Sequence, residues 1–442
     1  MTMANQRVSI VTLGCEKNAV DSEVMVGLME QKGYTMTDDP DLADVVIVNT
    51  CAFIDAAKQE SIDTILRIAA DKHPGKKLLV AGCMAQRYAA ELLEEIPEID
   101  GLVGTGEFPR IVDLIERVKS GERPKWTGNP VYIYDEFTPR KTAKGPSAYI
   151  KIAEGCDHKC TFCVIPQMRG AFRSRPIESI VAEAKQLVAQ GVREVNLIAQ
   201  DSTQYGLDLY GKRQLPELLH ALHGIEDLQW IRLHYAYPGY FTDELIEAFR
   251  ILPKVVKYVD MPLQHSEDHI LRSMQRPGRQ RHIRELVKKI RERIPGVVLR
   301  SSFIVGFPGE TEEDFQNLKA FVEEVGFDHV GVFTYSAEES SLAATFTNQV
   351  DDAEKERRAS ELMETARRVA AERMGRYVGE VVPVLIEGYD QADRSVYVGR
   401  TPFDAKEIDG LVYVTGVDLQ IGSIVPVRIS HAFEFDLVGE AV

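Results

Sequence analysis

The sequence predicts an α/β protein with three consecutive domains: a doubly wound parallel sheet, a partial (βα)6 barrel of the TIM type, and a small antiparallel β-barrel. Apolar strand patterns alternate with helical patterns over residues 1–120 and again over 147–376. Short β runs separated by Gly and Asp turns fill residues 377–442. Residues 121–146 are rich in Pro and Gly and are predicted to form a linker.

The first region consists of continuous apolar runs separated by helical patterns, which is typical of a parallel sheet covered on both faces. The expected strands are 7–14, 43–50, 76–82 and 99–106, and the expected helices are 22–33, 56–70, 86–96 and 109–120. The linker contains one further short β pattern at 131–134.

Six strand patterns with helical patterns between them predict the incomplete barrel. These strands are expected at 148–155, 194–201, 230–238, 258–265, 298–308 and 329–336, and a charged helix at 351–376 closes the region. In the last domain, four β runs are expected at 381–388, 395–400, 411–416 and 424–433.

Composition limits the function classes. The 442-residue chain is 44% hydrophobic and 27% charged, and no apolar run approaches the length of a membrane span. The start, MTMANQRVSIV, lacks the pattern of a secretory signal, so a cytoplasmic location is expected. A net charge of −16 disfavours general nucleic-acid binding and favours a basic partner.

Three of the six cysteines, Cys156, Cys160 and Cys163, lie within eight residues in the spacing C-x3-C-x2-C. A structural zinc ion needs four ligands, and His158 is poorly placed to join these three sulfurs on one ion. Thiolates also suit an iron–sulfur cluster. A 4Fe–4S cluster held by three cysteines has one open iron, which can bind a chelating small molecule.

The loop follows the first barrel strand, at the end of the barrel where active sites lie. With Phe162 before the third cysteine, it resembles the cluster motif of the radical S-adenosylmethionine (SAM) superfamily. This resemblance implies that SAM chelates the open iron and is split into methionine and a 5′-deoxyadenosyl radical. A structural zinc knuckle is the alternative.

Other side chains at the same end of the barrel are candidates for binding SAM or substrate. Gly306 and Gly309, in VGFPGET, would let the backbone approach a ligand closely, as in the adenine-side contact of radical SAM enzymes. An ordinary strand-to-helix turn is the alternative. The polar candidates, each of which could instead make only a supporting hydrogen bond, are Gln200, Asp201, His234, Gln264 and His265.

Three arginines, Arg169, Arg173 and Arg175, follow the cluster loop. Because arginine binds carboxylates in a fork geometry, they are candidates for orienting an acidic substrate or the SAM carboxylate. The alternative is a solvated or structurally paired run.

The remaining cysteines, Cys15, Cys51 and Cys83, each follow an expected strand of the first domain. Their separations of 36 and 32 residues match a βα repeat, and ligands bind beyond the carboxyl ends of parallel strands. The three cysteines are therefore expected to converge on a second 4Fe–4S cluster with an open iron. Three buried core cysteines are the alternative.

A cysteine-bearing α/β domain, a radical SAM barrel and a terminal β-barrel that looks like a TRAM domain together resemble the methylthiotransferases, over essentially the whole chain. The resemblance implies two 4Fe–4S clusters and two SAM molecules. One SAM gives a methyl group to sulfur on the auxiliary cluster, and the other yields the radical that takes hydrogen from the substrate carbon. We assign no catalytic residue beyond the cluster ligands.

Two branches of that family compete. One modifies an adenosine in tRNA. The other, the RimO-like branch, modifies the β-carbon of an aspartate in small-subunit ribosomal protein S twelve. TLGCEKNAVDSE (12–23) and EGCDHKCTFCVIPQMRGAFRSR (154–175) resemble the second branch more closely. Residue 16 departs from it, because this branch usually has proline where the chain has Glu16.

Charge also favours the ribosomal-protein branch. Residues 377–442 hold 11 acidic and 4 Lys/Arg residues, so the TRAM domain is expected to suit a basic ribosomal protein, unless the acids only keep it soluble. The segment 276–293 has 8 Lys/Arg against 2 Glu and is expected to be an outer helix with a basic face. This face is either only solvated or contacts RNA, which would be ribosomal RNA in the ribosomal-protein branch and tRNA in the rival branch. Flavodoxin or ferredoxin is the expected electron donor, and a zinc-binding scaffold is the non-enzyme alternative.

Overall fold

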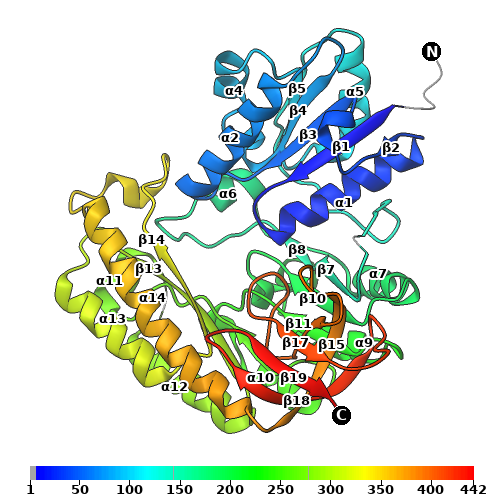
Figure 1. Cartoon of the computed structure of the whole chain (residues 1–442). Coiled ribbons are helices and arrows are strands. Elements are labelled where there is room, and N and C mark those ends of the chain that lie inside the picture. The colour runs from blue at the N-terminus through cyan, green and yellow to red at the C-terminus, as the bar shows by residue number, and fades with distance from the viewer. Residues whose placement is uncertain (1–5, 143, 277) are drawn as a thin grey trace.

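The computed structural model of the protein describes residues 6–142, 144–276 and 278–442. The sheet domain at the N-terminus lies above the partial barrel in Figure 1, and the small C-terminal β-barrel lies beside the partial barrel. Every helix in the described ranges is too short or too polar to cross a membrane.

Six parallel strands form the N-terminal sheet in the order β2-β1-β3-β4-β5-β6. The strands are β1 (Arg7–Thr12), β2 (Thr35–Met36), β3 (Val45–Thr50), β4 (Lys77–Gly82), β5 (Gly101–Val103) and β6 (Lys125–Trp126). The helices are α1 (Glu16–Gln31), α2 (Asp55–Ala70), α3 (Cys83–Arg87), α4 (Ala89–Glu95) and α5 (Ile111–Lys119), with 3-10 turns at Pro40–Leu42 and Phe108–Arg110. α1 and α5 cover one face and α2 and α4 the other, so the sheet is doubly wound, as predicted.

Local details of this domain differ from expectation. α1 begins six residues before the expected helix, because its first turns bury the polar residues Lys17, Asn18 and Asp21 and so lack an apolar periodicity. Residues 131–134 form no strand in the described structure. There the hydroxyl of Tyr134 instead accepts a hydrogen bond from the Lys151 amide at 3.2 Å.

Six parallel strands also form the central barrel, in the spatial order β7-β10-β11-β12-β13-β14. They are β7 (Ser147–Lys151), β10 (Glu194–Ile198), β11 (Trp230–Leu233), β12 (Tyr258–Asp260), β13 (Val298–Val305) and β14 (His329–Thr334). All six predicted barrel strands are present, each ending earlier than its apolar run. A bridge between Ile231 and Val255 and a hydrogen bond of 2.8 Å from the Ala236 amide to the Asp260 carbonyl join β11 to the β12 region.

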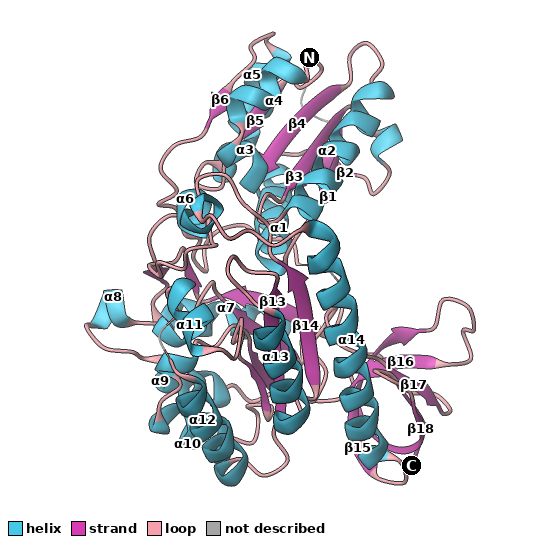
Figure 2. Ribbon diagram, turned by 90° about the vertical axis from the view of Figure 1, so that its left-hand side faces the viewer, coloured by secondary structure: helices cyan, strands magenta, loops and turns pink. Residues whose placement is uncertain are grey.

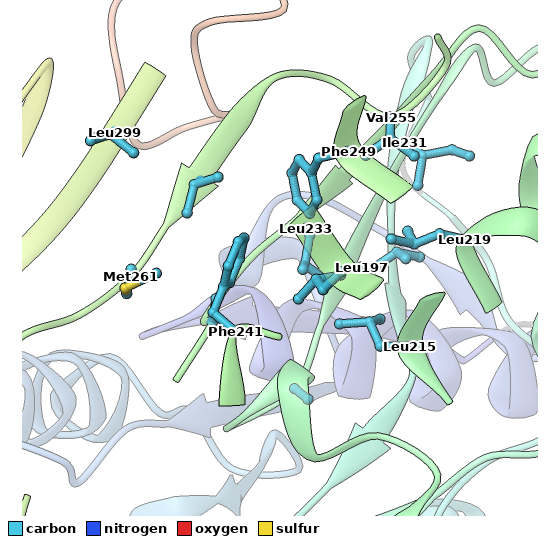
Figure 3. Close-up of a cluster of buried hydrophobic side chains, with 14 of the residues drawn as sticks. Leu197, Leu215, Leu219, Ile231, Leu233, Phe241, Phe249, Val255, Met261 and Leu299 are labelled. Atoms are coloured by element: carbon cyan, nitrogen blue, oxygen red, sulfur yellow. The ribbon is translucent and has the colours of Figure 1, made fainter. Parts of the chain in front are cut away.

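Helices cover the outside of these strands. They are α7 (Ile177–Ala189), α8 (Leu207–Tyr210), α9 (Leu215–His223), α10 (Asp243–Ile251), α11 (Asp268–Ser273), α12 (Gln280–Arg293), α13 (Glu312–Val325) and α14 (Asp352–Met374), with 3-10 turns at Ser202–Gln204, Pro238–Tyr240, Leu342–Thr345 and Gly375–Tyr377. The close-up in Figure 3 shows Leu197 and Leu233 on the strands facing Leu215 and Phe249 on the helices. Burying each such side chain contributes roughly 1.5–3 kcal/mol, so this layer stabilises the barrel.

Short elements shape the loop that carries the clustered cysteines. β8 (Ala153–Glu154) pairs antiparallel with β9 (Arg173–Ser174), and α6 (Ile165–Arg169) lies between them in the chain. The β8–β9 pair closes the base of the loop, so residues 155–172 project from the carboxyl end of the first barrel strand.

The C-terminal domain is a closed five-stranded barrel in the order β15-β16-β17-β19-β18. Its strands are β15 (Val381–Tyr389), β16 (Tyr397–Arg400), β17 (Val412–Thr415), β18 (Ile424–Ala432) and β19 (Leu437–Ala441), of which β19 was not expected from the sequence. Figure 2 shows α14 running along the central barrel towards this domain.

Residues 401–409 of the C-terminal domain, here called the closing loop, lie against the open side of the central barrel. The Tyr149 hydroxyl on the edge strand β7 donates to the Lys406 carbonyl at 2.9 Å. On the other edge strand, β14, His329 Nε2 lies 3.0 Å from the Phe403 carbonyl oxygen. Arg232 Nη1 on β11 also donates to the Pro402 carbonyl at 3.0 Å, so the loop packs against an inner strand of the barrel as well as against both edge strands.

Candidate functional site

The three cysteines of the N-terminal domain lie together at the carboxyl edge of its sheet. The chain leaves β1 towards β2 on one side and β3 on the other, and ligands bind beyond the strand ends at such a reversal. Gly14 has a φ of 86°, and a Cβ there would lie 2.6 Å from the Cβ of Cys51. Only glycine therefore lets the Cys15 segment approach Cys51.

Cys83 reaches the same edge through a second glycine turn. Gly82 has a φ of 94°, and a Cβ there would lie 2.4 Å from Oδ1 of Asn49. Cys83 then begins α3, with its Sγ 4.0 Å from Oδ1 of Asn18. The fold thus brings Cys15, Cys51 and Cys83 to one place, although more than 30 residues separate each from the next.

A glycine also sets the start of the barrel's cluster loop. Gly155 has a φ of 82°, and a Cβ there would lie 2.1 Å from the Ala171 carbonyl oxygen. Cys156 then donates its amide to the Gly170 carbonyl at 3.1 Å, and Cys163 donates to the Cys160 carbonyl at 3.1 Å. These backbone contacts fold the three cysteines into one compact turn.

Both groups of cysteines line one cavity of about 430 Å³ between the two domains. Burial, with the neighbouring Cys83 and Cys15, raises the pKa of Cys51 to about 12. Burial likewise raises the pKa values of Cys156 and Cys163 to about 12. Crowded thiols of this kind become thiolates when they bind a metal centre. Two sets of three soft ligands, each with space in front of it, fit two thiolate-bound clusters.

A network of buried charges joins the two domains behind the cavity. Lys151 Nζ on β7 lies 2.5 Å from Asp21 on α1 and 2.7 Å from Glu154 on β8. Arg169 Nη1 lies 2.7 Å from Asp21 and 3.3 Å from Glu154. Burial opposes the charge of Arg169, but Cys83 and Asp21 hold its pKa well above the usual value. The network fixes the cluster loop against α1.

The three arginines after the cluster loop thus lie in different surroundings. Of the three, only Arg169 lines the cavity. Arg173 donates to the backbone carbonyls of Ala171 and Arg169. Arg175 is buried, and its Nη1 lies 2.5 Å from Oε2 of Glu183. The structure therefore gives Arg173 and Arg175 partners inside the protein and away from the cavity.

The other residues that the sequence suggested as candidates fall into two groups, those that line the cavity and those that do not. Gln200, Asp201 and Gln264 line the cavity. Nε2 of Gln200 donates to Glu154 at 2.6 Å, and in the described structure its buried Oε1 has no hydrogen-bond partner. Asp201 lies 2.7 Å from Nε2 of His158, and the ring of His158 stacks on Tyr237 with a centroid distance of 4.0 Å.

Gly306, His234 and His265 lie outside the cavity lining. The Gly306 amide donates to Glu310 at 2.7 Å, and a Cβ at Gly306 would lie 2.3 Å from Cγ of Lys355. This glycine therefore makes room for α14. His234 and His265 are fully buried, with ring nitrogens 3.7 Å from Asp260 and 3.6 Å from Glu310, respectively.

Several cavity residues were not singled out from the sequence. They include Lys17, Tyr235, Tyr237, Arg276 and Arg300. The guanidinium of Arg276 lies 4.3 Å from the Tyr237 ring centroid, and its Nη1 lies 3.9 Å from Sγ of Cys160. Tyr235 and Tyr237 follow β11 in the segment LHYAYP (233–238), so their position after a strand is the sequence signal that could have identified them.

Models of known protein families match the chain in the same three regions. Residues 7–104 match the model described as Uncharacterized protein family UPF0004, residues 150–322 match the radical SAM superfamily, and residues 378–442 match the TRAM domain. The chain is 48% identical to "Ribosomal protein uS12 methylthiotransferase RimO" of Trichlorobacter lovleyi, covering 100% of this chain and 99% of that protein. It is 49% identical to the protein of the same name in Geobacter sulfurreducens, covering 100% of both.

Solved structures support the fold alone. The radical S-adenosylmethionine methyltransferase TsrM of Kitasatospora setae matches with a TM-score of 0.55 and 17% identity, over 74% of this chain and 73% of that one. The cobalamin-dependent S-adenosylmethionine radical enzyme OxsB matches with a TM-score of 0.52 and 10% identity, over 82% of this chain and 56% of that one.

Proposed function

The chain belongs to the RimO family of ribosomal protein uS12 methylthiotransferases, and from this membership we propose that it methylthiolates the β-carbon of an aspartate in uS12. The observation that carries the proposal is the single cavity lined by two separate sets of three cysteines. Radical generation needs one open cluster, whereas the transfer of a methylthio group also needs a place to hold sulfur.

We assign Cys156, Cys160 and Cys163 to the 4Fe–4S cluster that binds SAM, and Cys15, Cys51 and Cys83 to an auxiliary 4Fe–4S cluster. When bound, these groups and two SAM molecules would supply the hydrogen abstraction and the methylthio group. Among the described residues, the buried amide oxygen of Gln200 has no hydrogen-bond partner, and we propose that it accepts a hydrogen bond from SAM.

We propose that the three regions 1–120, 147–376 and 377–442, with the linker 121–146, act as the auxiliary-cluster, radical and substrate-docking domains. Among the eleven acids of the last region, Asp404 and Asp409 face the central barrel and Glu387 pairs with Arg400. Glu380, Asp393, Glu407, Asp418, Glu434 and Glu440 remain exposed. These exposed acids would attract the basic surface of uS12.

Other partners follow from the same reaction. The reductive step needs an electron donor such as flavodoxin or ferredoxin. α12 buries its apolar residues Ile283, Val287 and Ile290. The Lys and Arg side chains of the same helix would provide a basic surface for ribosomal RNA. Several of them are already paired, as Lys289 is with Asp243 at 2.5 Å, so this contact would be secondary. A ribosomal substrate implies a cytoplasmic reaction.

Mass spectrometry of uS12 tests the proposal. A mixture of the reconstituted protein, a reductant and SAM is incubated with uS12 in one reaction and with tRNA in another. We expect uS12 to gain one methylthio group in place of one hydrogen, at an aspartate, and tRNA to be unchanged. A modified adenosine with unmodified uS12 would assign the chain to tRNA modification. Bound zinc without iron would instead indicate a scaffold.

A further inference from the structure

We propose that Arg276 is the residue that binds a carboxylate group in the shared cavity. Arg276 follows α11 in the chain and lines the cavity. In the proposed reaction, carboxylates enter this cavity from two sources, the methionine part of SAM and the substrate aspartate. The inference rests on the proposed function, because it names the side chain that would recognise one of these groups.

The charges around the cavity single out Arg276. In the described structure, four lysine or arginine side chains line the cavity. Three of them pair with carboxylates of the protein, and these pairs are Lys17 with Glu16 at 2.5 Å, Arg169 with Asp21 at 2.7 Å and Arg300 with Asp260 at 2.9 Å. Within the same described ranges, Arg276 forms no ion pair with an Asp or Glu. Its charge is therefore available for a carboxylate brought by a ligand.

Neutral groups hold the guanidinium of Arg276 in place. Nη2 donates to the Pro262 carbonyl at 2.5 Å, and Nη1 lies 3.9 Å from Sγ of Cys160. The guanidinium also lies against the ring of Tyr237, 4.3 Å from its centroid. A guanidinium has more N–H donors than these contacts use, so donors remain for a ligand.

The main chain fixes Arg276 beside the cluster loop. The Arg276 amide donates to the Leu271 carbonyl at 2.8 Å, which closes the turn at the end of α11. The cluster loop is attached to the same turn, because the Thr161 amide donates to the Met274 carbonyl at 3.1 Å and the Thr161 hydroxyl donates to the Ser273 carbonyl at 2.9 Å. Arg276 and the loop that carries the barrel cysteines therefore keep a fixed relative position.

Tyr237, against which the guanidinium lies, is itself held by other residues. Its amide donates to Oγ1 of Thr203 at 3.1 Å, and its ring stacks on His158 with a centroid distance of 4.0 Å. Nε2 of His158 in turn lies 2.7 Å from Asp201. A binding group that is oriented in advance loses less conformational entropy when its ligand arrives.

A carboxylate is the ligand that an unpaired arginine favours. Arginine can bind a carboxylate through two parallel N–H···O bonds, and such bonds are stronger inside a protein than in water. Arg173 and Arg175 were expected from the sequence to play this part, but both lie outside the cavity lining and have partners inside the protein. Arg276 is therefore better placed for the role that was expected of them.

Binding of SAM to the reconstituted full-length protein is the first arm of the test. Isothermal titration calorimetry compares SAM with its carboxamide analogue, in which an uncharged amide replaces the carboxylate. If Arg276 holds the SAM carboxylate, Arg276→Gln should weaken SAM binding by about tenfold and leave binding of the analogue unchanged. Arg276→Lys keeps the charge but loses the fork of donors, so it should lose part of the same discrimination.

Binding of uS12 is the second arm. Two proteins, uS12 and uS12 with its target aspartate changed to asparagine, are titrated into the reconstituted, SAM-bound protein without reductant. If Arg276 holds the substrate aspartate, the wild type should bind uS12 about tenfold more tightly than the changed uS12. Arg276→Gln should then bind both equally.

Arg272→Gln is the matched control, because Arg272 is exposed on α11 and lies outside the cavity lining. It should discriminate between the ligands of each arm as the wild type does. The iron content of every variant is measured first, and Arg276→Lys serves in both arms if Arg276→Gln binds less iron than the wild type.

The two arms also separate this proposal from the proposed function. Loss of discrimination in one arm identifies the source of the carboxylate, whereas wild-type discrimination by the Arg276 variants in both arms would overturn the proposal. If the wild-type enzyme left uS12 unmodified while the SAM arm gave the expected result, Arg276 would keep its role and the proposed function would fail.

Discussion

Arg169 and Asp21 form an ion pair of 2.7 Å that joins the barrel's cluster loop to the first helix of the N-terminal domain. Both side chains are 4% exposed. Arg169 also donates to Oδ1 of Asn18 at 2.5 Å, the atom that lies 4.0 Å from Sγ of Cys83. One guanidinium therefore connects the surroundings of both cysteine sets.

Breaking this pair should destabilise the protein. Asp21→Asn leaves the buried charges of Arg169 and Lys151 with one carboxylate fewer, and we expect a loss of about 3–5 kcal/mol in the free energy of unfolding by urea. The control is Arg281→Ala, which removes an exposed ion pair with Glu285 and should have no measurable effect. Equal unfolding curves for the two variants would contradict the assigned role of the network.

Replacing each cysteine set should separate two activities. Alanine at Cys156, Cys160 and Cys163 should abolish SAM cleavage. Alanine at Cys15, Cys51 and Cys83 should leave SAM cleavage intact but prevent methylthiolation, which is measured by mass spectrometry of uS12. Each triple variant should keep about four irons, half the wild-type content. Equal loss of SAM cleavage in both variants would refute separate roles.

Gly155 should tolerate no side chain. Gly155→Ala would force a Cβ to within 2.1 Å of a carbonyl oxygen at a φ of 82°, so we expect a destabilisation well above ~1 kcal/mol and loss of the barrel iron. Gly388→Ala, where no atom lies within 4 Å of the added Cβ, is the control and should retain full iron content. Iron analysis and thermal unfolding measure both effects.

Asp404 should make stability depend on pH. Burial raises the pKa of Asp404 to about 6, and Oδ1 has no hydrogen-bond partner in the described structure. The folded state therefore holds this proton more tightly than the unfolded state, and stability should fall as pH rises from about 4 to about 6. The loss should total about 3 kcal/mol, from 1.36 kcal/mol per pKa unit.

Asp404→Asn tests that expectation, because asparagine stays neutral. The variant should match the wild type near pH 4 and unfold at a higher temperature than the wild type at pH 7. A stability advantage of Asp404→Asn at pH 7 that persists unchanged at pH 4 would mean that another group controls this dependence.

The cysteine arrangement was predictable because it depends on local patterns. The end of an apolar run in the sequence marks the end of a strand, and the carboxyl ends of parallel strands in one sheet lie at the same edge. Cys51 directly follows β3 and Cys83 directly follows β4, so strand periodicity alone placed them together. The short spacing of Cys156, Cys160 and Cys163 likewise made one turn the only simple arrangement.

The partners of the polar side chains were not predictable in this way. Arg169 is 148 residues from Asp21, so nothing near Arg169 in the sequence signals that its charge is already paired. Gly306 suggested a ligand, yet its missing side chain accommodates Lys355 of a helix that begins 46 residues later. The place of Tyr235 in the cavity was not predictable either, because its backbone has a φ of 60°, a conformation that tertiary contacts impose.

The closing loop limits how far this protein can be treated as interchangeable modules. Tyr149 and His329, on the two edge strands of the central barrel, bind backbone oxygens of the loop, and buried Arg400 of the C-terminal domain pairs with Glu194 at 2.5 Å. Exchanging the C-terminal domain for that of another enzyme would therefore remove these contacts unless Tyr149, His329 and Glu194 of the central barrel were exchanged with it. A chimera designed for a new macromolecular target must therefore take residues from both domains: the new C-terminal domain and the barrel residues that contact it.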